Sequence, residues 1–389
     1  MTPLQSYAST LECEGNGYYP TWRRSKMPRS FRTWGWGLAM LSILHFMHGV
    51  QPSFAELSGP FAVAAVDSSL PHYTPQTQVS GTFKVLGSET MYPLVSRLSL
   101  EFQRRQPKVA IQVRGGGSTK AIADFLQPPL SKVGKVMLPE DRAVSFQLIA
   151  TSRELFDAEV KEFSAQHGYE PTAVPVAVDA VALYVHKDNP VSGLTLEQVD
   201  AMFSTTRNRG YQTPITQWGQ LGLAGGWEQA PIQLYGRDRK SGTRAFFQEH
   251  CLAGGEFMPT LHEDPGAASV ILDVSRDQVG IGYSGLGLQA SSVKLIPLAE
   301  TAGMPFVTPS LSTVADQTYP LRRVLYLYVD KSPKSPLPAA AQEFLAFIMS
   351  QEGQEAVMKA GFFPLPANQA SKGAVALGLS SQPKQTTVR

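Results

Sequence analysis

Residues 236–244 read Gly236-Arg237-Asp238-Arg239-Lys240-Ser241-Gly242-Thr243-Arg244 and lead directly into the apolar run Ala245-Phe246-Phe247. The apolar run is compatible with a helix, so the stretch is expected to form the turn that opens it. Free backbone N–H groups at a helix start, together with the hydroxyls of Ser241 and Thr243, favour a bound anion. Arg237 adds a forked donor that is always charged. The stretch predicts a site for a small tetrahedral oxyanion; the alternative is a solvated basic turn with an ordinary helix cap.

The same stretch does not match the phosphate loop of nucleotide-binding proteins. That motif requires a glycine directly before the Lys-Ser pair, and Arg239 occupies this position. A nucleotide is therefore not the expected ligand.

Two further stretches have the same design of strand, loop and helix. Strand-like residues 109–113 lead into Arg114-Gly115-Gly116-Gly117-Ser118-Thr119, and strand-like residues 82–86 lead into Gly87-Ser88-Glu89-Thr90-Met91-Tyr92. The glycines allow the backbone to approach an anion closely. Ser88 or Thr90 would cap the next helix, with Pro93 in its first turn, and Ser118 would cap the helix after it. Each loop alone could be an ordinary capped turn, but three such loops together favour one shared anion site.

With these motifs in this order, the chain resembles the phosphate-binding proteins of bacterial high-affinity phosphate ABC transporters, from about Gly81 to about Ala367. This resemblance implies an α/β fold of the type II periplasmic-binding-protein class, with two lobes and two hinge crossings. Alternating strand and helix signals agree with α/β lobes. The other stretches that carry the resemblance are Ala150–Arg153, Val176–Ala182, Lys187–Pro190, Leu194–Val199, Gly280–Tyr283 and Gly353–Val357.

The resemblance also implies the residues that hold the anion. The three strand–loop–helix units supply most of them, and the stretch Ala150-Thr151-Ser152-Arg153 supplies a further serine. The implied phosphate ligands are Thr90, the Met91 backbone N–H, Ser118, Ser152, Arg237, Ser241, the Gly242 backbone and Thr243.

One position departs from the better-known members of this family. In those members, the serine that corresponds to Ser152 is followed directly by an aspartate, which accepts a hydrogen bond from protonated phosphate. Here Arg153 follows Ser152, as in one branch of the family. We expect Asp179, where the chain crosses between lobes, to supply the acceptor instead. The alternative is that Asp179 is a hinge cap or forms a salt bridge to a basic loop residue.

The predicted domain plan begins with an export signal. Arg29 and Arg32 precede an apolar stretch from 34 to 50 and the small-x-small cleavage site Ser53-Phe54-Ala55. The start is Met1 or Met27, and glycines and histidines inside the apolar stretch argue against a membrane anchor. The plan is a leader over 1–55, a flexible lead-in over 56–80, lobe one over 81–177 and 284–366, lobe two over 178–283, hinge crossings near 176–180 and 282–285, a surface insertion over 127–147, and a disordered tail over 367–389.

Composition narrows the class of protein. The chain has 389 residues, of which 43% are hydrophobic and only 17% charged, so it can bury a large core. Its net charge of +2 gives no support for nucleic-acid binding. Cys13 lies in the leader, so Cys251 is left without a disulfide partner and is expected to be buried.

We also expect no metal and no cofactor. His262-Glu263-Asp264 has two metal-ligand types close together, but no second histidine follows at helical spacing. A solvated loop is the expected structure there.

The predicted function is therefore a periplasmic solute-binding protein, not an enzyme, that captures inorganic phosphate and delivers it to an inner-membrane ABC permease and ATPase. A carboxylate that accepts a phosphate proton would repel fully ionised sulfate and so separate the two anions. The alternatives are a binding protein for another oxyanion, such as sulfate or molybdate, a phosphate sensor, or a phosphate-ester hydrolase built on the same anion-binding loops.

Overall fold

The computed structural model describes residues 65–75, 77–127, 147–288 and 290–379. These described residues belong to one compact unit. The predicted leader over 1–55 and residues 128–146 of the predicted insertion lie outside the described residues.

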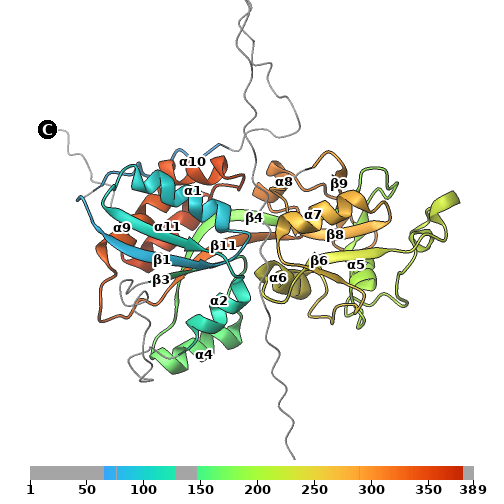
Figure 1. The fold of residues 1–389 in the computed structure, drawn as a ribbon, viewed down its shortest axis with the longest axis horizontal. Coiled ribbons are helices and arrows are strands. Elements are labelled where there is room, and N and C mark those ends of the chain that lie inside the picture. The colour runs from blue at the N-terminus through green and yellow to red at the C-terminus, as the bar shows by residue number, and fades with distance from the viewer. Residues whose placement is uncertain (1–64, 76, 128–146, 289, 380–389) are drawn as a thin grey trace, which may run out of the picture. The chain divides into compact units, whose positions relative to one another are not determined.

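A mixed β-sheet forms the centre of this unit (Figure 1). Nine strands of the described chain belong to it, in the order β2-β1-β3-β11-β4-β8-β6-β7, with β9 also paired to β4. A separate pair is formed by β5 (Leu194–Thr195) and β10 (Leu298–Ala299). The strands of the large sheet are β1 (Gly81–Gly87), β2 (Val109–Arg114), β3 (Gln147–Thr151), β4 (Thr172–His186), β6 (Gln233–Arg237), β7 (His262–Asp264), β8 (Gly280–Gly285), β9 (Val293–Leu295) and β11 (Arg322–Val329).

Strand β4 belongs to both ends of the sheet. Its residues 172–180 pair with β11, and its residues 181–186 pair with β8 and β9. Each residue of β4 from Val174 to His186 is buried, as expected for a nearly continuous apolar run that is covered on both faces. We call β2, β1, β3, β11 and residues 172–180 the first half-sheet, and residues 181–186 with β8, β9, β6 and β7 the second half-sheet.

Helices cover both faces of the first half-sheet (Figure 1). On one face Phe102 and Phe344 pack against each other and Phe344 packs on Phe83, with ring centroids 5.3 and 5.5 Å apart. On the other face Phe125 stacks on Phe163 at 4.7 Å. The first face carries α1 (Tyr92–Gln103), α9 (Ala339–Ile348) and α10 (Gln351–Lys359), and the second carries α2 (Ser118–Phe125) and α4 (Asp157–His167).

The second half-sheet is packed by α7 (Ala267–Arg276), which contacts β8, β4 and β6, and by α6 (Gly242–His250), which contacts β6. Cys251 directly follows α6 and is free and buried, as predicted. The remaining elements of the described chain are α5 (Leu196–Phe203), α8 (Leu311–Ala315), α11 (Ala367–Leu377) and the 3₁₀ helices Trp218–Leu221 and Gly225–Trp227.

The strand pairing moves one predicted lobe boundary. The prediction returns the chain to lobe one at residue 284, but β9 and β10 follow this position and pair with β4 and β5. The chain rejoins the first half-sheet only at Arg322, the start of β11. The other predicted crossing, at 176–180, lies in the part of β4 where the pairing partner changes after Ala180.

Two segments predicted to be irregular are ordered. The predicted tail begins with α11, whose Ala370, Gly373 and Leu377 are buried and which contacts β4. In the predicted lead-in, Tyr73 packs its ring on Phe347 at 5.3 Å, and the Tyr73 backbone N–H donates to the Glu352 carboxylate at 2.7 Å. The predictions of a disordered tail and a flexible lead-in were wrong for these residues. Their few apolar side chains pack on a core formed by distant parts of the chain, which the local sequence does not reveal.

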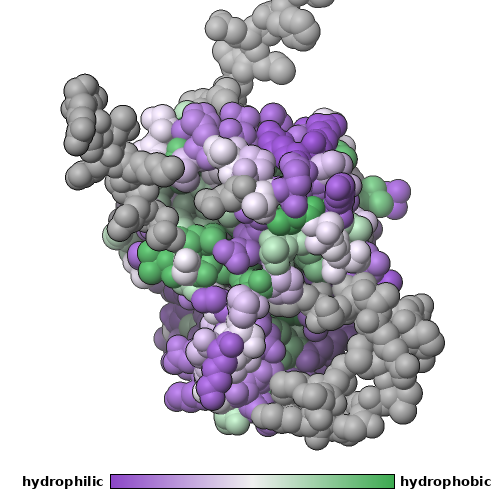
Figure 2. Space-filling view, turned by 90° about the vertical axis from the view of Figure 1, so that its left-hand side faces the viewer, coloured by the Kyte–Doolittle hydropathy of each residue, from purple (hydrophilic) through white to green (hydrophobic). Residues whose placement is uncertain are grey.

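One end of the molecule combines polar and apolar surface. Figure 2 shows the end that carries the first half-sheet, where hydrophilic side chains surround a hydrophobic area near the middle. In the described residues, the helices are all too short or too polar to cross a membrane.

The aromatic cluster around Phe344 should dominate the stability of the first half-sheet. We expect Phe344→Ala to lower the free energy of unfolding by about 3–5 kcal/mol, because it removes a fully buried ring from a packed cluster. Chemical denaturation measures this loss. The matched control is Phe306→Ala, whose ring is 53% exposed, and it should cost less than about 1 kcal/mol. Equal losses would contradict the assignment of the core.

Candidate anion-binding site

Four loops from the two half-sheets meet at one place. The parallel strands β1, β2 and β3 end at the same edge, so the loops that follow them lie together. The Ser118 and Ser152 hydroxyls lie 3.2 Å apart, and the Thr90 hydroxyl lies 3.1 Å from the Thr243 hydroxyl of the second half-sheet. Ser118, Ser152, Thr90 and Thr243 are all buried. The sequence-predicted hydroxyls are therefore brought together across the two half-sheets.

Of the serine hydroxyls in these loops, one caps a helix and another, predicted to do so, does not. Ser241 caps α6, because its Oγ accepts from the backbone N–H groups of Thr243 and Arg244. Helix α2 instead starts after Gly117, and Ser118 lies inside its first turn. The predicted capping role of Ser118 is wrong, so its hydroxyl is left for other contacts.

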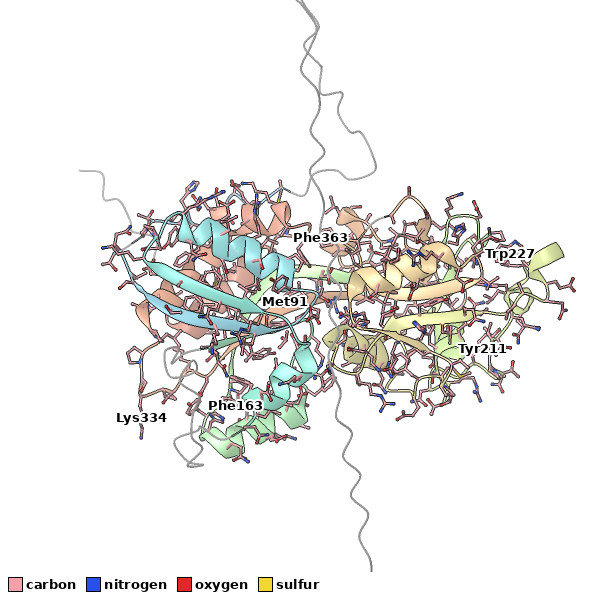
Figure 3. All side chains as sticks on the ribbon, viewed as in Figure 1. Met91, Phe163, Tyr211, Trp227, Lys334 and Phe363 are labelled. Carbon is pink, nitrogen blue, oxygen red and sulfur yellow. The ribbon has the colours of Figure 1, made fainter. Side chains whose placement is uncertain are left out.

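The start of α1 also differs from prediction. Its N-cap is Met91, without a side-chain capping bond, and Pro93 lies in the first turn as predicted. The Met91 backbone N–H already donates to the Ser88 hydroxyl at 3.2 Å. Met91 itself is fully buried and lies at the end of the first half-sheet that faces the second (Figure 3). Thr90 therefore keeps its hydroxyl free of capping and close to Thr243.

Two glycines allow the loops to touch. A Cβ on Gly242 would lie 2.5 Å from the Ser118 Oγ and 2.7 Å from the Ser152 Oγ. Gly117 has φ +94°, and a Cβ there would lie 2.3 Å from the Lys240 carbonyl oxygen. The Thr119 N–H donates to that same carbonyl at 3.0 Å. The basic turn of the second half-sheet thus packs directly on the second loop of the first half-sheet, which only glycine permits.

Arg237 is the least satisfied side chain of the site. It is 1% exposed, and its Nη2 donates to the Pro265 carbonyl at 3.1 Å. Its Nε and Nη1 have no hydrogen-bond partner among the described residues. Burial lowers the pKa of the guanidinium and outweighs the opposing charge of Asp238, but arginine stays charged in proteins. A buried cation with two unused donors needs an acceptor that the described side chains do not supply.

Sequence reasoning missed Arg323, the first buried residue of β11. Its Nε and Nη2 both donate to Oδ2 of Asp179, at 3.0 and 2.6 Å, and its Nη1 donates to the Thr243 hydroxyl at 2.9 Å. The two side chains are 1% and 3% exposed. A usable signal was the pair Arg322-Arg323 at the head of an apolar strand, where alternation must bury one of the two.

Arg153 does not point into the site. Its guanidinium forms two 2.7 Å bonds with the Glu159 carboxylate in the first turn of α4, and it lies 3.9 Å from the centre of the Phe156 ring. The residue that departs from the family pattern thus supports the next helix, while Ser152 beside it stays next to Ser118.

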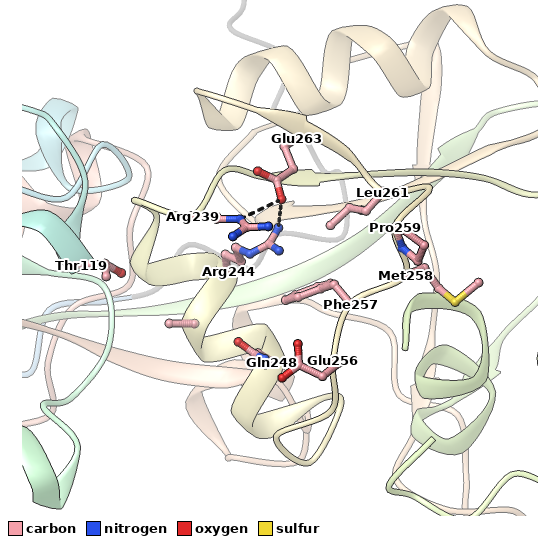
Figure 4. A pocket seen from close by; sticks show the side chains of 11 residues that line it. Thr119, Arg239, Arg244, Gln248, Glu256, Phe257, Met258, Pro259, Leu261 and Glu263 are labelled. Carbon is pink, nitrogen blue, oxygen red and sulfur yellow. Dashed lines mark ion pairs between the residues drawn. The ribbon is translucent and has the colours of Figure 1, made fainter. Parts of the chain in front are cut away.

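A pocket of about 580 Å³ lies beside these loops (Figure 4). Arg244 and Arg239 of the basic turn face it, and Glu263 pairs with both, at 3.1 and 3.8 Å. Phe257 covers the Arg244 guanidinium at 4.1 Å. These two arginines are therefore already paired, in contrast to Arg237, which has donors left over.

The fold and the site place the chain in a known class. A family model described as a PBP superfamily domain matches residues 73–352. The chain therefore belongs to the PBP superfamily. The periplasmic-binding-protein fold that the sequence predicts is confirmed.

Within this class, the chain is 43% identical to the phosphate-binding protein PstS of Pseudomonas aeruginosa, over 82% of this chain and 94% of that protein. It is 26% identical to the protein SphX of Synechococcus elongatus, over 82% of this chain and 88% of that protein. An ABC-type phosphate transport receptor from Vibrio cholerae has a similar fold, with a TM-score of 0.54 and 23% identity, over 73% of this chain and all of that one. The predicted family resemblance is thus confirmed.

The contact at Gly242 gives a test of the site geometry. We expect Gly242→Ala to lower the free energy of unfolding by about 1–3 kcal/mol, because the added methyl overlaps the Ser118 and Ser152 hydroxyls. Gly226→Ala is the control, since a Cβ at Gly226 meets no atom within 4 Å. Thermal and chemical denaturation of the two variants checks the difference. Indistinguishable stabilities would mean that these loops do not touch as described.

Proposed function

We propose that this chain is the solute-binding protein of an ABC transporter and that its ligand is inorganic phosphate. The observation that carries the proposal is Arg237, a buried guanidinium whose donor nitrogens Nε and Nη1 have no hydrogen-bond partner among the described residues. The serine and threonine hydroxyls around it offer further donors. A small oxyanion with several acceptor atoms supplies what this arrangement lacks.

The hydrogen bonding of the buried arginines supports an anion. Arg237 and Arg323 are both buried, and Asp179 is the buried carboxylate bonded to Arg323. Buried Asp264 lies opposite Arg237 on the neighbouring strand β7, but the Arg237 Nε and Nη1 have no hydrogen-bond partner among the described residues. A bound anion that accepts from these nitrogens gains charge-assisted hydrogen bonds.

The choice of phosphate draws on the relatives and on Asp179. The Pseudomonas aeruginosa relative is a phosphate-binding protein by name, and the Vibrio cholerae structure is named a phosphate transport receptor. The hydrogen bonds described at Asp179 use Oδ2, so Arg323 holds the carboxylate in one orientation. We infer that Oδ1 accepts the proton of a protonated phosphate, which sulfate lacks at neutral pH, so that Asp179 replaces the aspartate expected at position 153.

The biological setting follows from the class. Substrate-binding proteins of this family are not enzymes, and they act outside the inner membrane. The predicted leader would send this chain to the periplasm, where it would deliver phosphate to an inner-membrane permease and its ATPase. Calorimetric titration with phosphate, sulfate and molybdate tests the proposal, together with a chromogenic phosphate ester. Preference for sulfate or molybdate would overturn the choice of anion, and turnover of the ester would overturn the class.

Arg237→Ala should weaken phosphate binding by about 2–4 kcal/mol, because it removes the charge-assisted donors. Calorimetric titration measures the loss. Arg239→Ala is the matched control from the same turn, since the Arg239 side chain is 86% exposed, and it should change the affinity little. A variant lacking Arg237 that binds within threefold of the unmodified protein would place the anion elsewhere.

Asp179→Asn should narrow the gap between phosphate and sulfate affinity, because the amide can donate to sulfate where the carboxylate repels it. Phosphate binding should weaken by about 1–3 kcal/mol. The same change weakens the pair with Arg323, so the melting temperature should fall as well. A lower melting temperature with an unchanged ratio of phosphate to sulfate affinity would show that Asp179 pairs with Arg323 but does not accept a proton from phosphate.

A further inference from the structure

A second polar cluster lies one strand away from the anion site. His262 and Asp264 lie two residues apart on β7, so their side chains are on the same face of this edge strand. Helix α7 adds Asp273, and the His262 Nε2 lies 3.7 Å from the Asp273 Oδ2. One ligand atom from each of the three side chains falls within 4.8 Å of the other two. The strand replaces the solvated loop that the sequence predicts for these residues.

The buried carboxylate of this cluster, Asp264, has an oxygen without a hydrogen-bond donor among the described residues. Asp264 is 4% exposed, and its Oδ2 has no hydrogen-bond partner in the described chain. Its neighbour Asp273 is another carboxylate, and two carboxylates can be joined only by a shared proton or by a cation. A bound cation would give the unpartnered Asp264 Oδ2 a partner and would offset the repulsion between the two carboxylates.

The ligand types and spacing suit a transition metal. One imidazole nitrogen and two carboxylate oxygens match a three-residue zinc site with an open fourth position. Tetrahedral coordination at ordinary bond lengths separates ligand atoms by about 3.4 Å, so small side-chain rotations would complete the site. The His262 side chain is 62% exposed, which leaves a path for the ion and room for a water ligand. The imidazole disfavours Mg²⁺ and Ca²⁺, which prefer oxygen ligands alone.

We propose that His262, Asp264 and Asp273 bind a divalent transition-metal ion, with Zn²⁺ the favoured ion. Other histidine–carboxylate pairs of the described chain lack the third ligand. His186 lies 3.6 Å from Asp188, almost the same distance as in the cluster, but no buried carboxylate joins them in a group of three. The proposal does not depend on the ligand of the anion site.

The test is calorimetric titration of the untagged full chain with ZnCl₂, after chelator treatment and in phosphate-free buffer. We expect an event of one Zn²⁺ per chain that Asp273→Asn and His262→Gln each weaken at least roughly tenfold. Asp188→Asn is the matched control and should leave this event unchanged. Cobalt substitution should give the intense visible absorption of a tetrahedral site in the unmodified protein and in Asp188→Asn, but not in the two cluster variants.

Two outcomes would overturn the site. One is the absence of stoichiometric Zn²⁺ uptake by the unmodified chain. The other is equal Zn²⁺ affinity in the unmodified chain and both cluster variants, which would place the ion elsewhere. Both variants alter partly exposed side chains, and circular dichroism melts identify a variant that fails to fold. If one variant unfolds, the other still decides the question.

Discussion

The arrangement of this protein depends on the cost of burying guanidinium groups. Arg237 and Arg323 come from strands of different half-sheets, β6 and β11, yet both are almost fully excluded from water. Asp179 compensates one of them through two hydrogen bonds to a single oxygen. The other keeps two donors without partners. An imbalance of this kind is tolerated where a ligand completes it, so stability and recognition draw on the same charges.

The close packing around these charges keeps them buried away from bulk solvent. Gly242 and Gly117 remove side chains where the loops cross, so Ser118, Ser152 and the Lys240 carbonyl come into contact. Burial strengthens each charge-assisted hydrogen bond, because the effective dielectric constant is low. In the proposed site, an anion without a proton to donate would face the buried Asp179 carboxylate, and burial makes that repulsion costly.

Local sequence was informative about the loops and poor about what packs on them. Glycines, hydroxyls and Arg237 predict an anion site, because helix starts and glycine turns act over a few neighbouring residues. The sequence analysis did not single out Arg323 or Asp273, because each contacts its partner only through strand pairing or helix packing. The same applies to α11 and to Tyr73, which are ordered by a distant core rather than by their own sequence. The boundary at 284 failed because short strands such as β9 carry little pattern.

The shared strand β4 has a mechanical consequence. It passes from the first half-sheet to the second as one continuous strand, and β11 starts beside the point where its partner changes. The two halves are thus joined by a hydrogen-bonded ribbon instead of a free linker. Strands in a sheet are twisted relative to one another by a variable angle, so the twist of such a ribbon can differ without breaking its hydrogen bonds. Any turning of one half relative to the other would therefore have to twist paired strands, which stay ordered and lose little chain entropy.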